Sequence, residues 1–206
     1  ALAFSQPLNP SLTWEKQKLF TVGVNGRLWN RFDFDISYYV RKTSNMLMDV
    51  PYPYTTGFSS VTSNVGELQN SGIDVRLGVD IVRTKDYFVN FSTTFNYNKM
   101  KVTSLFDGRN RWEVANTMVA YVVGSPVMYY LPLYAGVDPT DGAPMWYKAG
   151  DNKDVTTKSE TTTDFQEAAL TQNSGKKRFA PVNGGFGLSA GWKGITLQAD
   201  FSYVLG

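Results

Sequence analysis

The 206-residue chain contains no cysteine and no histidine. The lack of cysteine excludes disulfides, thiolate metal sites and cysteine nucleophiles from this segment, and the lack of histidine excludes Ser-His triads and histidine-ligated zinc. The carboxylates Asp33, Asp35, Asp74 and Asp80 share strand faces with arginines, which is typical of a solvated face rather than of acid-base chemistry. We therefore expect no catalytic residue, no metal, no cofactor and no enzymatic activity.

Charge of one sign and long apolar runs are scarce as well. Lysine and arginine exceed aspartate and glutamate by only two, and no basic run is longer than 176–178, so we expect no nucleic-acid partner. No stretch reaches the ~18 consecutive apolar residues that a transmembrane helix needs. The first ten residues lack the basic-then-apolar order of a signal peptide, and we expect the chain to be part of a longer protein.

What the sequence does contain is an alternation of apolar and polar residues, clearest in 20–40. Phe32, Phe34 and Ile36 fall on one face of a strand, and Asp33 and Asp35 fall on the other. Two such strands joined at 29–30 predict a β-hairpin. The same period of two recurs in 69–82, 87–97 and, as a second hairpin turning at 193–194, in 186–203.

Eight strands are predicted in all, and their connections alternate in length. Turns at 29–30, 83–86, 137–142 and 193–194 are short, whereas the loops at 49–68, 103–118 and 149–182 are long and rich in polar residues. The stretch 119–138 is apolar on both faces, and Pro132 predicts an irregular strand or a bulge there. Residues 143–148 form a short return strand.

This order of short and long connections is typical of outer-membrane β-barrels, which have short periplasmic turns and long external loops. Aromatic residues stand near both strand ends, as two membrane girdles require. From Tyr87 to Tyr97 there are ten steps of ~3.3 Å, which a tilt of ~40° projects to about 25 Å, the height of a lipid-facing band. The sequence thus predicts an all-β chain, an antiparallel up-and-down transmembrane β-barrel segment.

The residues of the alternating strands that we expect to face outer-membrane lipid share one side of each strand. They are Phe32, Phe34, Ile36, Ile73, Val75, Leu77, Val79, Phe91, Phe95, Leu197 and Phe201. Two other architectures remain open. One is a soluble β-sandwich module that binds carbohydrate or peptide through Tyr52, Tyr54 and Phe58. The other is a complete small eight-stranded barrel.

Several short motifs resemble the SusC/RagA class of TonB-dependent outer-membrane transporters of Bacteroidetes. They follow in order along nearly the whole chain: NPSLTWE at 9–15, TGF at 56–58, NVG at 64–66, NSGI at 70–73, FNYNK at 95–99, VGSP at 123–126, GVDP at 136–139, DG at 141–142 and WKG at 192–194. The resemblance places the segment in the later part of the barrel. It implies about eight strands of a 22-stranded barrel, with residues 1–206 forming a partial barrel domain that lacks the plug, the TonB box and the remaining strands.

The resemblance also implies a function: TonB-driven import of oligosaccharides or peptides across the outer membrane, together with a SusD-like surface lipoprotein. The TonB complex would act through parts of the protein outside this segment. For contact with a ligand or partner we single out the aromatic residues of the long connections: Tyr52, Tyr54, Phe58, Trp112 and Trp146. Packing of the loops on themselves is the alternative role for these rings.

Overall fold

The computed structural model describes residues 7–114, 117–148, 158, 160–168 and 172–206. The chain divides into two compact units. The long-strand unit consists of Gln17–Lys42, Gln69–Met100 and Phe179–Gly206, and the short-sheet unit consists of Ala1–Lys16, Thr43–Leu68 and Lys101–Arg178. No helix in the described part of the chain is long and apolar enough to cross a membrane.

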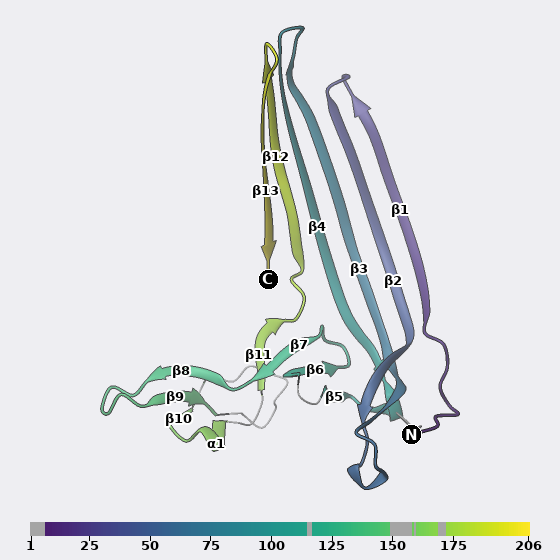
Figure 1. Ribbon diagram of the computed structural model, residues 1–206, viewed down its shortest axis with the longest axis vertical. Coiled ribbons are helices and arrows are strands. Elements are labelled where there is room, and N and C mark those ends of the chain that lie inside the picture. The colour runs from purple at the N-terminus through teal and green to yellow at the C-terminus, as the bar shows by residue number, and fades with distance from the viewer. Residues whose placement is uncertain (1–6, 115–116, 149–157, 159, 169–171) are drawn as a thin grey trace, which may run out of the picture. The chain divides into compact units, whose positions relative to one another are not determined.

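The long-strand unit is built around a six-stranded sheet with the order β1-β2-β3-β4-β12-β13. Its strands are β1 (Lys16–Leu28), β2 (Phe32–Pro51), β3 (Ser60–Arg83), β4 (Tyr87–Leu105), β12 (Val182–Trp192) and β13 (Ile195–Leu205). With 20, 24 and 19 residues, β2, β3 and β4 far exceed the five or six residues typical of soluble strands. β1 and β13 form the two edges of the sheet (Figure 1).

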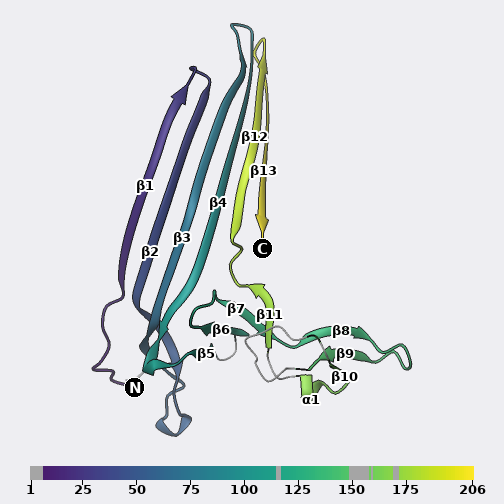
Figure 2. The same cartoon turned by 180° about the vertical axis from the view of Figure 1, so that it is seen from behind.

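Three tight turns join these strands in pairs, and all three lie at the same end of the sheet (Figure 2). Trp29 and Asn30 have φ of 48° and 59°, and Lys193 and Gly194 have φ of 45° and 87°. Two consecutive residues with positive φ are typical of the type I′ turn, whose twist matches that of a β-hairpin. The third turn, at 84–86, is closed by a 2.9 Å hydrogen bond that the Thr84 amide donates to the Tyr87 carbonyl.

The register separates an apolar face of this sheet from a polar one. On one face Leu188 is opposite both Phe91 and Ala199, and Phe186 is opposite Phe201. The residues between them point to the other face, which on β4 consists of Phe88, Asn90, Ser92, Thr94, Asn96 and Asn98. The predicted alternation is therefore confirmed, and neighbouring strands keep it in phase.

The short-sheet unit contains two further antiparallel sheets. One has the order β11-β7-β6-β5 and the other has the order β10-β9-β8. Their strands are β5 (Arg111–Val114), β6 (Val119–Val122), β7 (Met128–Leu131), β8 (Leu133–Val137), β9 (Pro144–Tyr147), β10 (Thr161–Thr162) and β11 (Gln172–Lys177). Three short helices accompany them: η1 (Tyr54–Thr56), η2 (Phe106–Gly108) and α1 (Phe165–Ala168).

These sheets correct parts of the predicted organisation. β4 pairs directly with β12, so the predicted strands at 119–138 and 143–148 lie in the connection between two neighbouring strands rather than in the six-stranded sheet. The turn at 137–142 joins β8 to β9 of a three-stranded sheet. The other three short turns connect strands of the six-stranded sheet. As predicted, the strand is interrupted at Pro132, between β7 and β8. Proline cannot donate a hydrogen bond to a neighbouring strand.

The predicted long loops are shorter than expected. Residues 49–51 and 60–68 belong to β2 and β3, and the predicted loop at 103–118 contains β5. Asn45 lies inside β2 and has a positive φ of 56°. A residue with positive φ is a local irregularity, of the kind found in β-bulges, and β2 continues on both sides of it. Its carbonyl accepts a 2.8 Å hydrogen bond from the Asn64 side chain. Side-chain amides thus extend strands where the apolar period is lost.

Among the residues that the structure describes, the buried apolar side chains all lie in the short-sheet unit. They are Val61, Val65, Val102, Leu105, Trp112, Val119, Ala120, Tyr121, Val127 and Tyr130. No large apolar side chain is buried in the described part of the long-strand unit. The apolar face of its sheet therefore stays at least partly exposed within the described residues.

Candidate functional site

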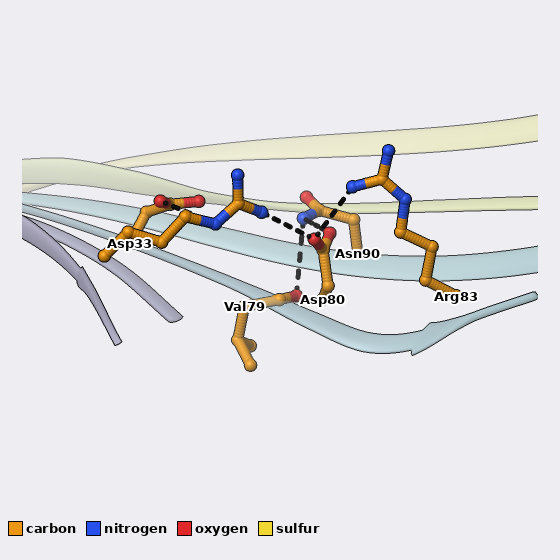
Figure 3. A network of polar contacts seen from close by, with 6 residues as sticks. Asp33, Val79, Asp80, Arg83 and Asn90 are labelled. Atoms are coloured by element: carbon orange, nitrogen blue, oxygen red, sulfur yellow. Dashed lines mark hydrogen bonds and ion pairs between the residues drawn. The ribbon is translucent and has the colours of Figure 1, made fainter. Parts of the chain in front are cut away.

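Ion pairs and a hydrogen bond join four strands on the polar face of the six-stranded sheet, close to the short turns. The Asp80 carboxylate lies 3.1 Å from the Arg27 guanidinium and 3.6 Å from that of Arg83. It also accepts a 3.0 Å hydrogen bond from the Asn90 amide, and Arg27 lies 3.4 Å from Asp33 (Figure 3). Because these side chains are partly exposed, each pair contributes about 1 kcal/mol or less, and the network mainly sets the polarity of this face.

A second polar row lies farther along the same face. Asn183 donates a 3.1 Å hydrogen bond to Asn96, which in turn donates to Asp74. A shallow hollow of about 370 Å³ opens beside this row. Its lining includes Asp35, Ser37, Asp74, Arg76, Asn96 and Asn183. Carboxylates, amides, a hydroxyl and a guanidinium favour contact with water or with polar solutes.

The residues predicted to face lipid occupy the apolar side of their strands. Leu197 is 68% exposed and Phe201 is 57% exposed, and the Phe201 ring stacks on Phe186 at a centroid distance of 4.9 Å. Phe34, Leu77 and Phe91 are half-buried by neighbours on the same sheet. Contact of these residues with lipid stays a prediction.

The aromatic residues predicted to contact a ligand lie in three places in the chain: around η1, on β5 and on β9. Tyr52 is 40% exposed and Phe58 is half-buried, and both flank η1 between β2 and β3. The side chain of Tyr54 lies outside the part of the chain that the structure describes. Ligand contact by these three residues stays a prediction.

Trp112 and Trp146 pack against rings of their own chain. Trp112 is 6% exposed, stacks on Tyr121 at 5.6 Å and meets Phe106 edge-on at 5.6 Å. Trp146 is half-buried and meets Phe165 at 5.1 Å. These contacts favour the self-packing role that the sequence left open, and ligand contact by the two tryptophans stays a prediction. Burial also raises the pKa of the Tyr121 phenol, against the opposing charge of Arg178.

The structure places a feature beside Trp112 that the sequence analysis did not recognise. Asp107 and Gly108 have φ of 52° and 65°, and the Arg109 amide donates a 3.1 Å hydrogen bond to the Phe106 carbonyl. Asp-Gly is a strong signal for such a tight turn, so this reversal was predictable. It brings the Arg109 guanidinium carbon to 4.8 Å from the centre of the Phe106 ring.

Grouped metal ligands are absent from the described residues, where no three acidic side chains come close enough to hold an ion. Asp138 and Asp141 accept hydrogen bonds of 2.8 and 2.9 Å from backbone amides of their own turn. Their observed role is turn formation.

Taken together, the long antiparallel strands, the short turns at one end, and the opposed apolar and polar faces define a segment of a membrane β-barrel wall. The sheet is open, because β1 and β13 are edges that do not pair with each other. This order does not support a closed small barrel. A β-sandwich is not favoured either, because among the described residues the apolar face of the long-strand unit buries no large apolar side chain.

Comparisons with known proteins show which membrane proteins this chain is similar to. The chain is 34% identical over 105 residues to TonB-dependent receptor P26 of Formosa agariphila, a match that covers 50% of this chain and 11% of the relative. It is 32% identical over 102 residues to TonB-dependent receptor SusC of Bacteroides thetaiotaomicron, covering 48% of this chain and 10% of the relative. No protein-family model matches the chain.

Solved structures match over the full chain. A structure of the RagAB peptide transporter superposes with a TM-score of 0.87 and 40% identity, covering all of this chain and 23% of that one. The RagAB peptide importer in its open-open state gives a TM-score of 0.83 at 40% identity. The predicted resemblance to the SusC/RagA family and the predicted fold class are confirmed. The chain spans less than a quarter of that structure, and its matched part is about a tenth of the curated relatives.

Proposed function

We propose that this segment forms part of the wall of a TonB-dependent transporter in the outer membrane of a Bacteroidetes-type cell. The apolar face of β4, β12 and β13 would contact lipid, and the polar face around Asp80 and Asp74 would line a water-filled lumen. The observation that carries the proposal is the full-length superposition on RagAB at 40% identity. The exposed apolar face supports it independently.

The transported substrate would be a peptide or an oligosaccharide, taken up with a SusD-like surface lipoprotein. The RagAB structures are described as those of a peptide transporter and peptide importer, which favours peptides. The similarity to SusC keeps oligosaccharides as the second candidate. A catalytic role is not part of the proposal, since the relatives are named as receptors and transporters.

The parent polypeptide provides a first test. Because 206 residues are 23% of the superposed RagAB chain, that chain has about 900 residues, and at 23.0 kDa per 206 residues a similar protein would have a mass of about 100 kDa. We expect a polypeptide of this size in the outer-membrane fraction, purified together with a lipoprotein. A water-soluble parent protein that needs no detergent would contradict the proposal.

Uptake provides the second test. Cells with the intact gene should accumulate fluorescent peptides or oligosaccharides too large for porins, and loss of TonB should abolish uptake without reducing the amount of barrel. Peptides and oligosaccharides are assayed separately, so that the substrate class is decided by which probe is taken up. Uptake of neither, or uptake unaffected by loss of TonB, would contradict the proposed activity.

A further inference from the structure

A hollow of about 460 Å³ opens within the short-sheet unit at the start of β5. It is lined by Val50, Phe106, Arg109, Arg111, Trp112 and Glu113. Its volume suits a small chemical group rather than a protein surface. The lining combines two guanidinium groups, one carboxylate and two aromatic rings, and none of the residues proposed above as lumen wall contributes to it.

The two arginines of the hollow differ in their electrostatic environment. Arg111 lies 2.5 Å from the Glu113 carboxylate and 4.7 Å from the centre of the Tyr130 ring. Arg109 contacts the Phe106 ring, and within the described residues no carboxylate lies at ion-pair distance from it. Because Glu113 compensates Arg111, the hollow has an excess positive charge at Arg109.

The position of the Arg109 guanidinium is set by a rigid aromatic stack. Phe106, over which it lies, meets Trp112 edge-on at 5.6 Å, and Trp112 stacks on Tyr121 at 5.6 Å. Trp112 and Tyr121 are 6% and 7% exposed, so the end of the stack away from Arg109 is fixed in the core. A guanidinium carries its N–H donors around its edge, where they can form a bidentate pair with a planar anion.

We propose that this hollow is a carboxylate-binding subsite of the transporter and that Arg109 is the residue that contacts the anion. The inference rests on the proposed function for the origin of the ligand, namely a carboxylate carried by the transported substrate. A peptide C-terminus and a uronate residue of an acidic oligosaccharide offer the same planar anion. Preference for acidic substrates is the property that this subsite would add.

The test measures binding to the purified full-length transporter with its lipoprotein by calorimetry. One pair of probes is a tripeptide with a free C-terminal carboxylate and the same tripeptide with a C-terminal amide. The other pair is trigalacturonate and neutral galactotriose. Variants are Arg109→Gln, which removes the charge, and Arg109→Lys, which keeps the charge without the planar fork. Arg31→Gln is the matched control, because it makes the same change in another exposed arginine, which lies at the turn between β1 and β2 and outside the hollow.

We expect the wild-type protein to prefer the carboxylate probe of at least one pair. Arg109→Gln should reduce this preference about tenfold, in the range expected for a hydrogen bond to a charged group. Arg109→Lys should retain part of the preference, and Arg31→Gln should leave it unchanged. The pair that responds identifies the source of the carboxylate. Native folding of each variant is checked by its heat-dependent mobility in gels.

Three results would overturn the subsite: no preference in the wild-type protein, an unchanged preference in Arg109→Gln, or an equal loss in Arg31→Gln. If neutral probes are taken up in a TonB-dependent way but carboxylates are not preferred, the subsite is wrong and the transport function stands. If the preference depends on Arg109 but no probe is taken up, the subsite stands and the transport function is wrong.

Discussion

Gly184 in β12 lies beneath the ring of Tyr203 on the neighbouring strand. A Cβ atom at this position would clash with the Thr94 carbonyl oxygen and the Tyr203 hydroxyl, and that hydroxyl donates a 3.3 Å hydrogen bond to the same carbonyl. Because the obstacle includes backbone, the clash cannot be relieved by a rotamer change. The close approach of three strands at this point therefore depends on the absence of a side chain.

We predict that Gly184→Ala lowers the stability of the barrel by about 1–3 kcal/mol, the usual cost of overpacking. The measurement is the urea midpoint of unfolding of the full-length protein in detergent. Gly78→Ala is the matched control, since its Cβ would meet only the Cβ of Asp33 at 3.8 Å, an ordinary contact. Equal midpoints for the two variants would show that the packing of Tyr203 over Gly184 is unimportant.

The turn after β8 should respond to acid. The Thr140 amide donates a 2.8 Å hydrogen bond to the Asp138 carboxylate, and this bond, with that of the Thr140 side chain, lowers the pKa of Asp138. A lowered pKa means that the stabilisation is present above the unfolded pKa and is lost as the pH falls through the folded pKa. We expect hydrogen exchange of the Thr140 amide, corrected for its intrinsic rate, to lose protection over that acidic range. Asp138→Ala should lack this pH dependence.

At the scale of one strand, β13 allows its two faces to be compared. Phe201 lies on the apolar face and Ser202 on the polar face, and both are exposed. Near the middle of a lipid-facing band an arginine costs about 2–4 kcal/mol, whereas lumen positions tolerate charge. We therefore predict that Phe201→Arg impairs barrel assembly and stability far more than Ser202→Arg.

The comparison is read from heat-dependent gel mobility and urea unfolding. Phe201→Leu isolates the loss of the stacking contact with Phe186, so that the remaining difference reports the charge. If Phe201→Arg and Ser202→Arg were equally tolerated, the apolar face would not be in lipid.

The elements differ in how well their sequences predicted them. In β3 the alternation of Ile73, Val75 and Leu77 with polar residues identified the strand directly. For its first part, Ser60 to Leu68, the sequence predicts a loop, because the stretch 49–68 contains two prolines, two glycines and many serine and threonine residues. These residues are part of the sheet, and side-chain bonds support them as well, as between Asn64 and the backbone of Thr13 and Asn45. Such partners are distant in sequence and leave no periodic signal.

For the whole molecule, the central question is what pairs with the two edges of the sheet. β1 and β13 lie at opposite ends of the strand order, whereas in a small closed barrel they would be neighbours. We predict that cysteine pairs introduced along β1 and β13 of a cysteine-free full-length protein, beginning with Val22→Cys and Leu197→Cys, do not form disulfides. Bonding requires Cα atoms within about 7 Å.

Leu188→Cys with Ala199→Cys is the positive control, because these residues are directly opposite each other on β12 and β13. Efficient crosslinking between β1 and β13 would contradict a larger barrel and support closure of this segment on itself. Crosslinks from β1 and β13 to other strands of the parent protein would support the proposed barrel.

The sequence by itself determined that the chain is antiparallel β, which face of each long strand is apolar, where the hairpins at 29–30 and 193–194 turn, and which transporter family it resembles. These properties depend on a period of two and on residues adjacent in the chain, which are local. Only the tertiary structure decided that β4 pairs with β12, that apolar residues of 119–138 are buried in the core of the short-sheet unit, and that Arg109 lies over Phe106. These features depend on contacts between residues whose partners cannot be read from spacing, because strand pairing and side-chain packing are selected by the free energy of the folded chain.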